Sequence, residues 1–261
     1  MQAKRNRPSV APTALAIGLL LASASAVAVE VDVSAQRASL SDGFQAQHAQ
    51  TLRLGWHGPS ERLLQFTVEA KQAFGERATL LIGSLAQDLS PDDRIGFALA
   101  VSDAQTIAAQ SRVDGHYSRK LLPERNLVAT LAGFAANVAD GHRDRGLVGS
   151  AAWYFADRQV VEAGVRMARS SPGPITAWRG FAAYTWGTVG VDTFALRVES
   201  GREAYQSLGP GAAVADFRSH EAGLSWRHWL NPEAGFGVDW ARYQNPSYRR
   251  HTLGASAFIT F

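Results

Sequence analysis

Arg94–Ser102 reads RIGFALAVS, and this stretch decides the fold. Every second residue in Ile95–Val101 is apolar, whereas the residues between and around them are charged, small or hydroxylated. Successive side chains of a β-strand point to opposite faces, so this period of two predicts a strand with one apolar face. The segment Val161–Ala168 (VEAGVRMA) repeats the pattern and places Glu162 and Arg166 on its polar face.

The chain after residue 28 divides into segments of the same kind, each bounded by Gly, Pro, Asp or Asn. The sequence therefore predicts an all-β fold, a transmembrane antiparallel up-and-down β-barrel of about 14 strands. Twelve strands is the nearest alternative, which applies if the first strand and the ambiguous segment 78–88 are not both in the wall. The predicted strands are 29–40, 44–57, 62–74, 78–88, 94–103, 106–119, 125–138, 146–156, 159–170, 176–187, 191–200, 216–229, 235–244 and 248–261.

The amino-terminal segment has the pattern of a secretory signal peptide. Three basic residues precede an apolar stretch, Ala14–Ala28, that ends in small residues. Two A-x-A cleavage sites fit, ending at Ala26 and at Ala28, and the second is favoured because strand-like alternation starts directly after it. We predict a signal peptide over residues 1–28 and, over 29–261, a β-barrel in the outer membrane of a Gram-negative bacterium.

Composition excludes several classes of function. The signal peptide holds three of the 26 Lys and Arg residues and none of the 23 Asp and Glu residues, so the mature chain is electrically neutral. A nucleic-acid partner would require a clustered basic face, and the sequence holds no such cluster. The chain has no cysteine, which excludes thiolate metal sites and thiol chemistry, and we expect no metal and no cofactor. After the signal, no apolar run approaches the roughly 18 residues of a membrane-spanning helix.

The connections between predicted strands fit one orientation in the membrane. With both chain ends in the periplasm, the alternate turns on that side are brief. The longest gap, Gly201–Ala215, and the charged loop Asp140–Arg145 then fall on the external side.

The chain ends in an aromatic residue. Counting back by twos from Phe261 gives an apolar row that runs to Leu253, while small and hydroxylated residues occupy the other face. This pattern resembles the carboxy-terminal signature that the barrel assembly machinery recognises. We therefore predict that Phe261 is part of an assembly signal.

Six tryptophans lie near predicted strand ends or on the outward row. Amphipathic rings at these positions are typical of the girdles where a barrel meets the bilayer surface, and a carbohydrate-stacking platform is the alternative. The six are Trp56, Trp153, Trp186, Trp226, Trp229 and Trp240.

The signal peptide, the barrel length and two aromatic strand ends together resemble the YaiO-type outer-membrane protein family. The strand ends are Trp153–Arg158 (WYFADR) and Trp229–Glu233 (WLNPE). The resemblance covers the whole mature chain and implies an outer-membrane barrel, in some members associated with surface-polysaccharide systems. It implies no catalytic motif.

The strand pattern argues against a catalytic Ser-His pair. Some outer-membrane barrels hydrolyse lipid esters with a Ser-His pair, and His220 and Ser225 lie close together in the sequence. Their parity differs, so they face opposite sides of one strand and cannot easily share a proton. We expect no enzymatic activity. The external residues His142–Arg145 could hold a phosphate or a sugar acid, but a solvated hairpin is the favoured interpretation, because charged residues keep an external loop soluble.

The inward row carries charges of both signs. Arginine outnumbers lysine by 23 to 3, and the planar guanidinium suits ion pairs that bridge neighbouring strands. These charges either brace the barrel or line a passage for solutes. The lumen-lining residues that we single out are Glu162, Arg166, Arg179, Arg197, Glu221, Arg227 and Asp239, and the same parity adds Glu69, Lys71, Arg94, Arg112, Asp114, Glu199 and Arg250.

Three functions remain. The first is a passage or surface-binding barrel in an envelope or polysaccharide-related system, the second a structural scaffold, and the third a lipid-modifying enzyme. The expected partners are outer-membrane lipid, the assembly machinery during biogenesis, and a polysaccharide as a candidate ligand.

Overall fold

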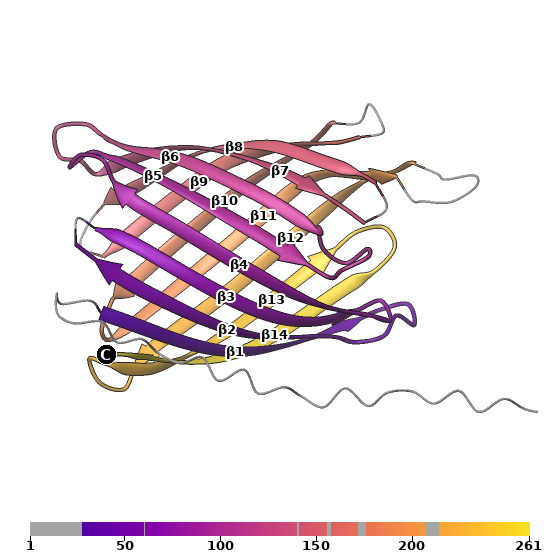
Figure 1. Ribbon diagram of the computed structural model, residues 1–261, viewed down its shortest axis with the longest axis horizontal. Helices are drawn as coiled ribbons and strands as arrows, with labels where there is room; N and C mark the ends of the chain where they lie inside the picture. Colours follow the sequence, from indigo (N-terminus) through magenta and orange to yellow (C-terminus); the bar gives the residue numbers. More distant parts are fainter. Residues whose placement is uncertain (1–27, 60, 140, 156–157, 172–175, 207–213) are drawn as a thin grey trace, which may run out of the picture.

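The computed structural model describes residues 28–261 except 60, 140, 156–157, 172–175 and 207–213. These residues form one closed antiparallel barrel of 14 strands, as the sequence predicts (Figure 1). In the part of the chain that is described, no helix is long and apolar enough to cross a membrane.

Each strand is ten residues long or more. The strands are β1 (Ala28–Leu40), β2 (Gln47–Gly58), β3 (Arg62–Ala73), β4 (Glu76–Asp88), β5 (Asp93–Ser102), β6 (Ser111–Leu121), β7 (Leu127–Asn137), β8 (Arg143–Phe155), β9 (Gln159–Ser171), β10 (Thr176–Thr188), β11 (Asp192–Gln206), β12 (Val214–Trp229), β13 (Ala234–Gln244) and β14 (Arg249–Thr260).

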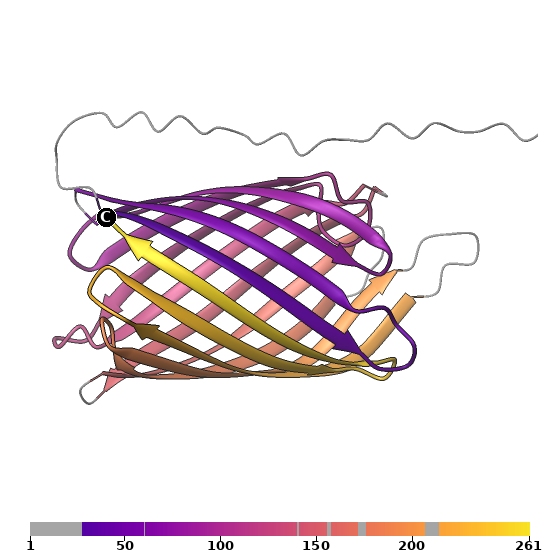
Figure 2. The ribbon, with the colours of Figure 1, turned by 90° about the horizontal axis from the view of Figure 1, so that it is seen from below.

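Every strand pairs with its neighbours in the chain, and the first strand pairs with the last. The seam between β1 and β14 places Val33 opposite Ala257 and is visible where indigo meets yellow in Figure 2. Beyond β14, Phe261 and Val29 exchange two backbone hydrogen bonds of 2.9 and 3.2 Å. Closure leaves no unpaired sheet edge, which a barrel in lipid requires.

The alternation read from the sequence sets the two faces of the wall. Apolar side chains such as Leu99, Leu131 and Leu253 point outward and are about 60% exposed. An exposed apolar surface around the whole circumference is stable only in contact with lipid. The alternate residues point into the barrel interior, which we call the lumen.

The two ends of the barrel differ in their connections. We call the end of the barrel where Val29 and Phe261 lie the terminal end, and the opposite end the far end. The terminal end has turns of three to five residues, whereas the far end has connections of up to eight residues. The predicted long loop Gly201–Ala215 is mostly strand, because β11 continues to residue 206 and β12 begins at residue 214. Alternation of hydrophobicity is lost there because charged residues occur on both faces, with Arg202 and Asp216 outward and Glu203 inward. For the same reason Arg143–Arg145, predicted as loop, are the first residues of β8.

Outward charges gather at the far end. Among the described strand residues, ten outward charged side chains lie within five positions of the far end of their strand. Nine of them are arginines, and we call these nine the arginine collar. The tenth is Asp216, which pairs with Arg202. The collar consists of Arg37, Arg77, Arg143, Arg145, Arg169, Arg202, Arg218, Arg242 and Arg249. At the terminal end the described strands carry a balanced outward set, Arg62, Asp93, Arg119 and Asp192.

Outward aromatic rings form a ladder near the terminal end. Trp186, Phe194 and Trp226 stack on adjacent strands with ring centroids 5.3 and 6.1 Å apart. Trp229 departs from the predicted girdle: it has the inward parity at the end of β12, and its ring packs at 5.4 Å against Phe258. The odd spacing from Trp226 reverses its face.

The predicted signal peptide lies outside the described residues except for Ala28. That residue is the first of β1 and pairs with His57. Cleavage after Ala28 stays a prediction.

Candidate functional site in the lumen

A large lumenal cavity has a volume of about 960 Å³ and is bordered by β1–β3 and β9–β14. Its lining contains carboxylates and basic groups from both sides of the seam. Five of the seven residues singled out from the sequence line it: Glu162, Arg197, Glu221, Arg227 and Asp239. The other two, Arg166 and Arg179, are not in its lining, and both pair with Glu199, which also pairs with the lining residue Arg197.

A second cavity of about 360 Å³ lies toward the terminal end. It is bordered by Asp88, Arg94 and Lys120, among others, and Arg94 Nη1 donates to Asp88 at 2.8 Å. Glu162 lines both cavities. The two cavities therefore share this residue of the wall.

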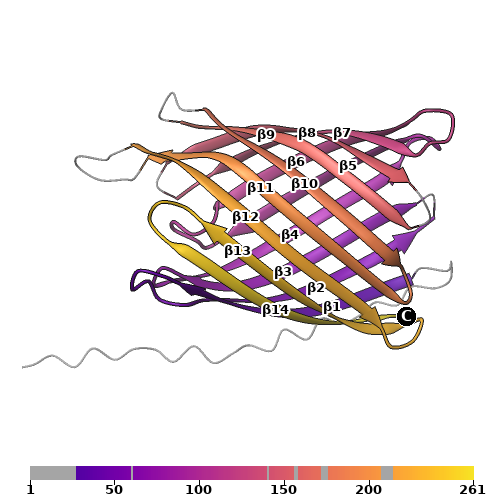
Figure 3. The ribbon, with the colours of Figure 1, turned by 180° about the vertical axis from the view of Figure 1, so that it is seen from behind.

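Glu199 is the centre of a charge network on the wall formed by β9–β12, which faces the viewer in Figure 3. Its carboxylate lies 2.7 Å from Arg179 Nε, 3.7 Å from Arg166 Nη1 and 3.6 Å from Arg197 Nη2. Consecutive strands bring these four residues together because they share the inward parity. Three arginines around one carboxylate leave positive charge that faces the lumen.

Glu203 extends this network toward the far end. Arg179 also pairs with Glu203, which accepts hydrogen bonds from Ser219 Oγ at 2.5 Å and from Tyr243 Oη at 3.2 Å. Tyr243 in turn lies under Arg250, whose guanidinium is 4.9 Å from the ring. The far-end half of this wall is thus tied together from β10 to β14.

A second cluster braces the closing seam. Arg227 Nη2 on β12 contacts Glu30 Oε1 on β1 at 3.0 Å, across the two intervening strands. Its guanidinium also lies 3.6 Å from the centre of the Phe258 ring. Gly235 makes room for that ring, since a Cβ there would lie 2.4 Å from it and 2.1 Å from the His228 carbonyl.

The arginines of the lumen are of two kinds. Arg179 is 15% exposed and holds two carboxylates, so it acts as a brace. Arg166 and Arg197 are 42% and 46% exposed although they point inward. Inward side chains keep that much surface only where the interior has room for water.

Sequence reasoning missed several inward charges. Glu30, Asp32 and Arg53 have the inward parity, and Asp32 and Arg53 line the large cavity. Valines alternate with acidic residues in Val29–Val33, and this pattern could have indicated that Glu30 and Asp32 point inward. Glu203 was missed because its segment was assigned to a loop.

The lumen also has an apolar portion, which corrects the expectation of a charged or small inward row. Leu80 and Ile82 pair with the inward residues Glu69 and Thr67, so they point inward too. Phe134 lies beneath the Arg112 guanidinium at 4.3 Å. The segment 78–88 was ambiguous in sequence because apolar residues occupy both of its faces.

The Ser-His pair considered from the sequence does not form. His220 points outward, whereas Ser225 lines the lumenal cavity. The outward neighbour of His220 is Ser200 on β11, and the Ser200 Oγ and His220 Nδ1 atoms are 2.9 Å apart.

The charged segment at the start of β8 does not converge on one point. Arg143 and Arg145 point outward, whereas Asp144 accepts a hydrogen bond from Ser170 Oγ on the inward side at 2.5 Å. In the described residues no group of three or more His, Asp or Glu side chains is placed to hold a metal ion.

A family model of the YaiO membrane β-barrel domain matches residues 28–206, more than half of the chain. The chain belongs to the YaiO family. The match begins with β1 and covers the strands that carry Glu162, Arg166, Arg179 and Arg197. No curated protein matches the chain.

Solved structures of several barrels share this YaiO barrel's fold at low sequence identity. A structure described as the CymD monoaromatic hydrocarbon channel matches with a TM-score of 0.60 and 10% identity over 90% of this chain and 87% of that one. A "bacterial polysaccharide outer membrane secretin" matches with a TM-score of 0.55 and 11% identity over 89% and 97% of the two chains. OmpTdeltaL8, from an outer membrane protein of Vibrio cholerae, matches with a TM-score of 0.50 and 8% identity over 89% and 98%.

Family membership and fold together place the protein in the outer membrane, as the sequence predicts. Outer-membrane barrels have short periplasmic turns and longer external loops. The far end, with its longer connections, is therefore the external end, and the terminal end faces the periplasm.

Proposed function

We propose that this barrel is a passage through the outer membrane for small hydrophilic solutes. The observation that carries the proposal is the cavity of about 960 Å³ in the lumen, into which Arg197 projects while 46% exposed. Barrels of eight strands fill their interior with side chains and those of 16–18 strands enclose water, so 14 strands leave room for a narrow aqueous path. The smaller cavity at Glu162 continues this path toward the periplasm.

Charges of both signs line the path, which argues against a single-ion filter. Arg197, Glu221 and Asp239 border the same cavity. We therefore expect a weakly ion-selective passage that admits neutral or zwitterionic solutes.

Saccharides are the solute class that the lining fits best. A sugar presents hydroxyl groups at its edge and C–H groups on its face, and the lumen offers ion-paired groups on β9–β14 and the apolar Leu80 and Ile82 on β4. The YaiO resemblance and the fold shared with a polysaccharide secretin point in the same direction. This step concerns the solute alone, and the passage itself does not depend on it.

Planar-bilayer recording of the processed full-length barrel tests the passage. We expect discrete conductance steps in potassium chloride and a small reversal potential under a salt gradient. Glu162→Gln should move that reversal potential toward anion preference, because it removes a carboxylate that lines both cavities. Glu124→Gln, the same change in an exposed turn, is the matched control and should leave it unchanged.

Swelling of liposomes that contain the barrel tests the solute class. Mono- and disaccharides should enter faster than charged solutes of equal size. A folded barrel that neither conducts nor swells liposomes would refute the passage and leave the scaffold reading. Conductance without sugar entry would overturn only the saccharide step.

A further inference from the structure

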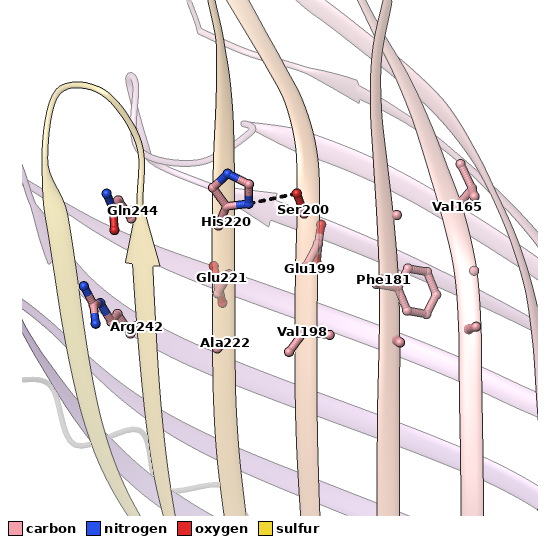
Figure 4. A pocket seen from close by; sticks show the side chains of 14 residues that line it. Val165, Phe181, Val198, Glu199, Ser200, His220, Glu221, Ala222, Arg242 and Gln244 are labelled. Atoms are coloured by element: carbon pink, nitrogen blue, oxygen red, sulfur yellow. Dashed lines mark hydrogen bonds between the residues drawn. The ribbon is translucent and has the colours of Figure 1, made fainter.

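A groove of about 800 Å³ lies on the outside of the barrel, over β9 to β13 (Figure 4). Its floor consists of the outward residues Ala163, Gly180, Ala182, Val198 and Ala222, with Val198 between Ala182 and Ala222. Larger outward side chains, such as Val165 at its border, stand above this floor. Four of the five floor residues are Gly or Ala, which hollows the lipid-facing surface, and the floor presents only hydrocarbon.

One end of the groove is polar. Ser200 and His220 are joined by a hydrogen bond of 2.9 Å, and Arg242 and Gln244 lie beside them on β13 (Figure 4). His220 pairs across the sheet with Gln244. All four side chains are exposed on the outer surface.

No carboxylate neutralises Arg242 among the described residues. Glu199 and Glu221 also border the groove, but their side chains turn to the lumen, where they pair with arginines such as Arg179 and Arg250. The polar end of the groove thus combines an uncompensated guanidinium, an imidazole, a hydroxyl and an amide. Each of these groups can donate a hydrogen bond to an anion, since even a neutral imidazole keeps one ring N–H.

The position of this polar end matches the charge of the whole barrel. Arg242 belongs to the arginine collar, in which nine outward arginines face one outward acid at the external end. The periplasmic end has no such excess among its described strand residues. An excess of guanidinium groups at one membrane boundary is complementary to phosphate groups in the leaflet at that boundary.

We infer that the groove binds a phosphorylated lipid of the outer leaflet. An acyl chain lies across the floor from Ala222 over Val198 to Ala163, and the phosphate contacts Arg242 and His220. Small residues let the chain approach the backbone closely, as they do at packed interfaces within membranes. Arginine binds phosphate through paired, charge-assisted hydrogen bonds, which gives the headgroup a defined position.

Two variants separate the headgroup contact from the chain contact. Arg242→Gln removes the guanidinium and keeps an amide. Gly180→Leu fills the floor, and the site tolerates a side chain, since an added Cβ would meet only the Gly164 carbonyl at 4.0 Å. Arg62→Gln, which removes an outward arginine at the periplasmic end, is the matched control.

The test measures how tightly diphosphoryl lipid A binds to the full-length processed barrel in detergent micelles. Native mass spectrometry detects the bound lipid. We expect Arg242→Gln to weaken the tightest bound lipid about tenfold, Gly180→Leu to weaken it several-fold, and Arg62→Gln to leave it unchanged. A dephosphorylated form of the same lipid should bind as weakly to wild type as the diphosphoryl form binds to Arg242→Gln.

Equal binding by all variants, or equal binding of the phosphate-free lipid, would overturn the inference. Displacement of the lipid by millimolar sodium phosphate would also overturn it, because the site would then bind free anion. A heat-dependent gel shift shows that each variant is folded. The conductance of the lumen is measured separately, so this result does not depend on the passage.

Discussion

Leu196→Arg tests the assignment of the two faces of the wall. Leu196 points outward on β11, midway between the outward polar residues Asp192 and Ser200, and is 45% exposed. Its cross-strand neighbours are Tyr184 and Leu224, so a charge there would have only aromatic and aliphatic groups around it. An arginine near the bilayer midplane costs about 2–4 kcal/mol, which lowers the folding equilibrium constant roughly 30- to 700-fold.

Refolding into lipid vesicles with a urea titration, read by the gel shift of unheated samples, measures this loss. Ser39→Arg is the control, because Ser39 is outward near the external end of β1, where an added arginine should cost about 0–1 kcal/mol. Equal stability of Leu196→Arg and wild type would show that Leu196 does not face lipid. The parity of β11 would then be reversed, and with it the lumenal position of Arg197 and Glu199.

Three further predictions concern Arg179, Phe261 and the cleavage site after Ala28. Arg179→Gln should fold but lower the free energy of unfolding by about 2 kcal/mol in the same titration. The loss is limited because Glu203 retains its hydrogen bond from Ser219 and Glu199 retains its ion pairs with two other arginines. Complete failure to fold would contradict this. Phe261→Ala keeps the backbone bonds to Val29 and should lower the amount of barrel assembled in cells while the refolded barrel keeps its stability; normal assembly in cells would argue against an assembly signal. Amino-terminal sequencing of the protein from outer membranes should begin at Val29, and an intact Met1 would contradict the predicted cleavage.

The sequence predicts the fold well because a barrel in lipid imposes the same alternation on nearly every strand. Phe97, Leu99 and Val101 lie outward as the pattern requires, and the 14 strands differ from the predicted ranges mainly at their ends. The strand ends were harder to predict from the sequence. Strands β11 and β12 continue beyond the apolar belt, where Arg202 and Asp216 face water. There hydrophobicity no longer distinguishes the two faces.

The sites depend on register, which sequence alternation alone does not supply. Parity indicated that Glu199 and Arg179 share a face, but only the cross-strand register brings their charged atoms within 2.7 Å. The same holds for Ser200 and His220, which are far apart in sequence and paired across β11 and β12. Prediction of the external groove likewise depends on the register, which decides which small residues of neighbouring strands lie side by side.

Thiol labelling of the lumen tests the central claim most directly. The chain has no cysteine, so Ala195→Cys and Leu196→Cys each create a unique thiol on adjacent residues of β11. Ala195 lines the large cavity and Leu196 faces lipid. A bulky, charged thiol reagent added during planar-bilayer recording should reduce the conductance of Ala195→Cys and leave that of Leu196→Cys unchanged. No conductance before labelling, or equal effects at the two positions, would contradict a passage through the lumen.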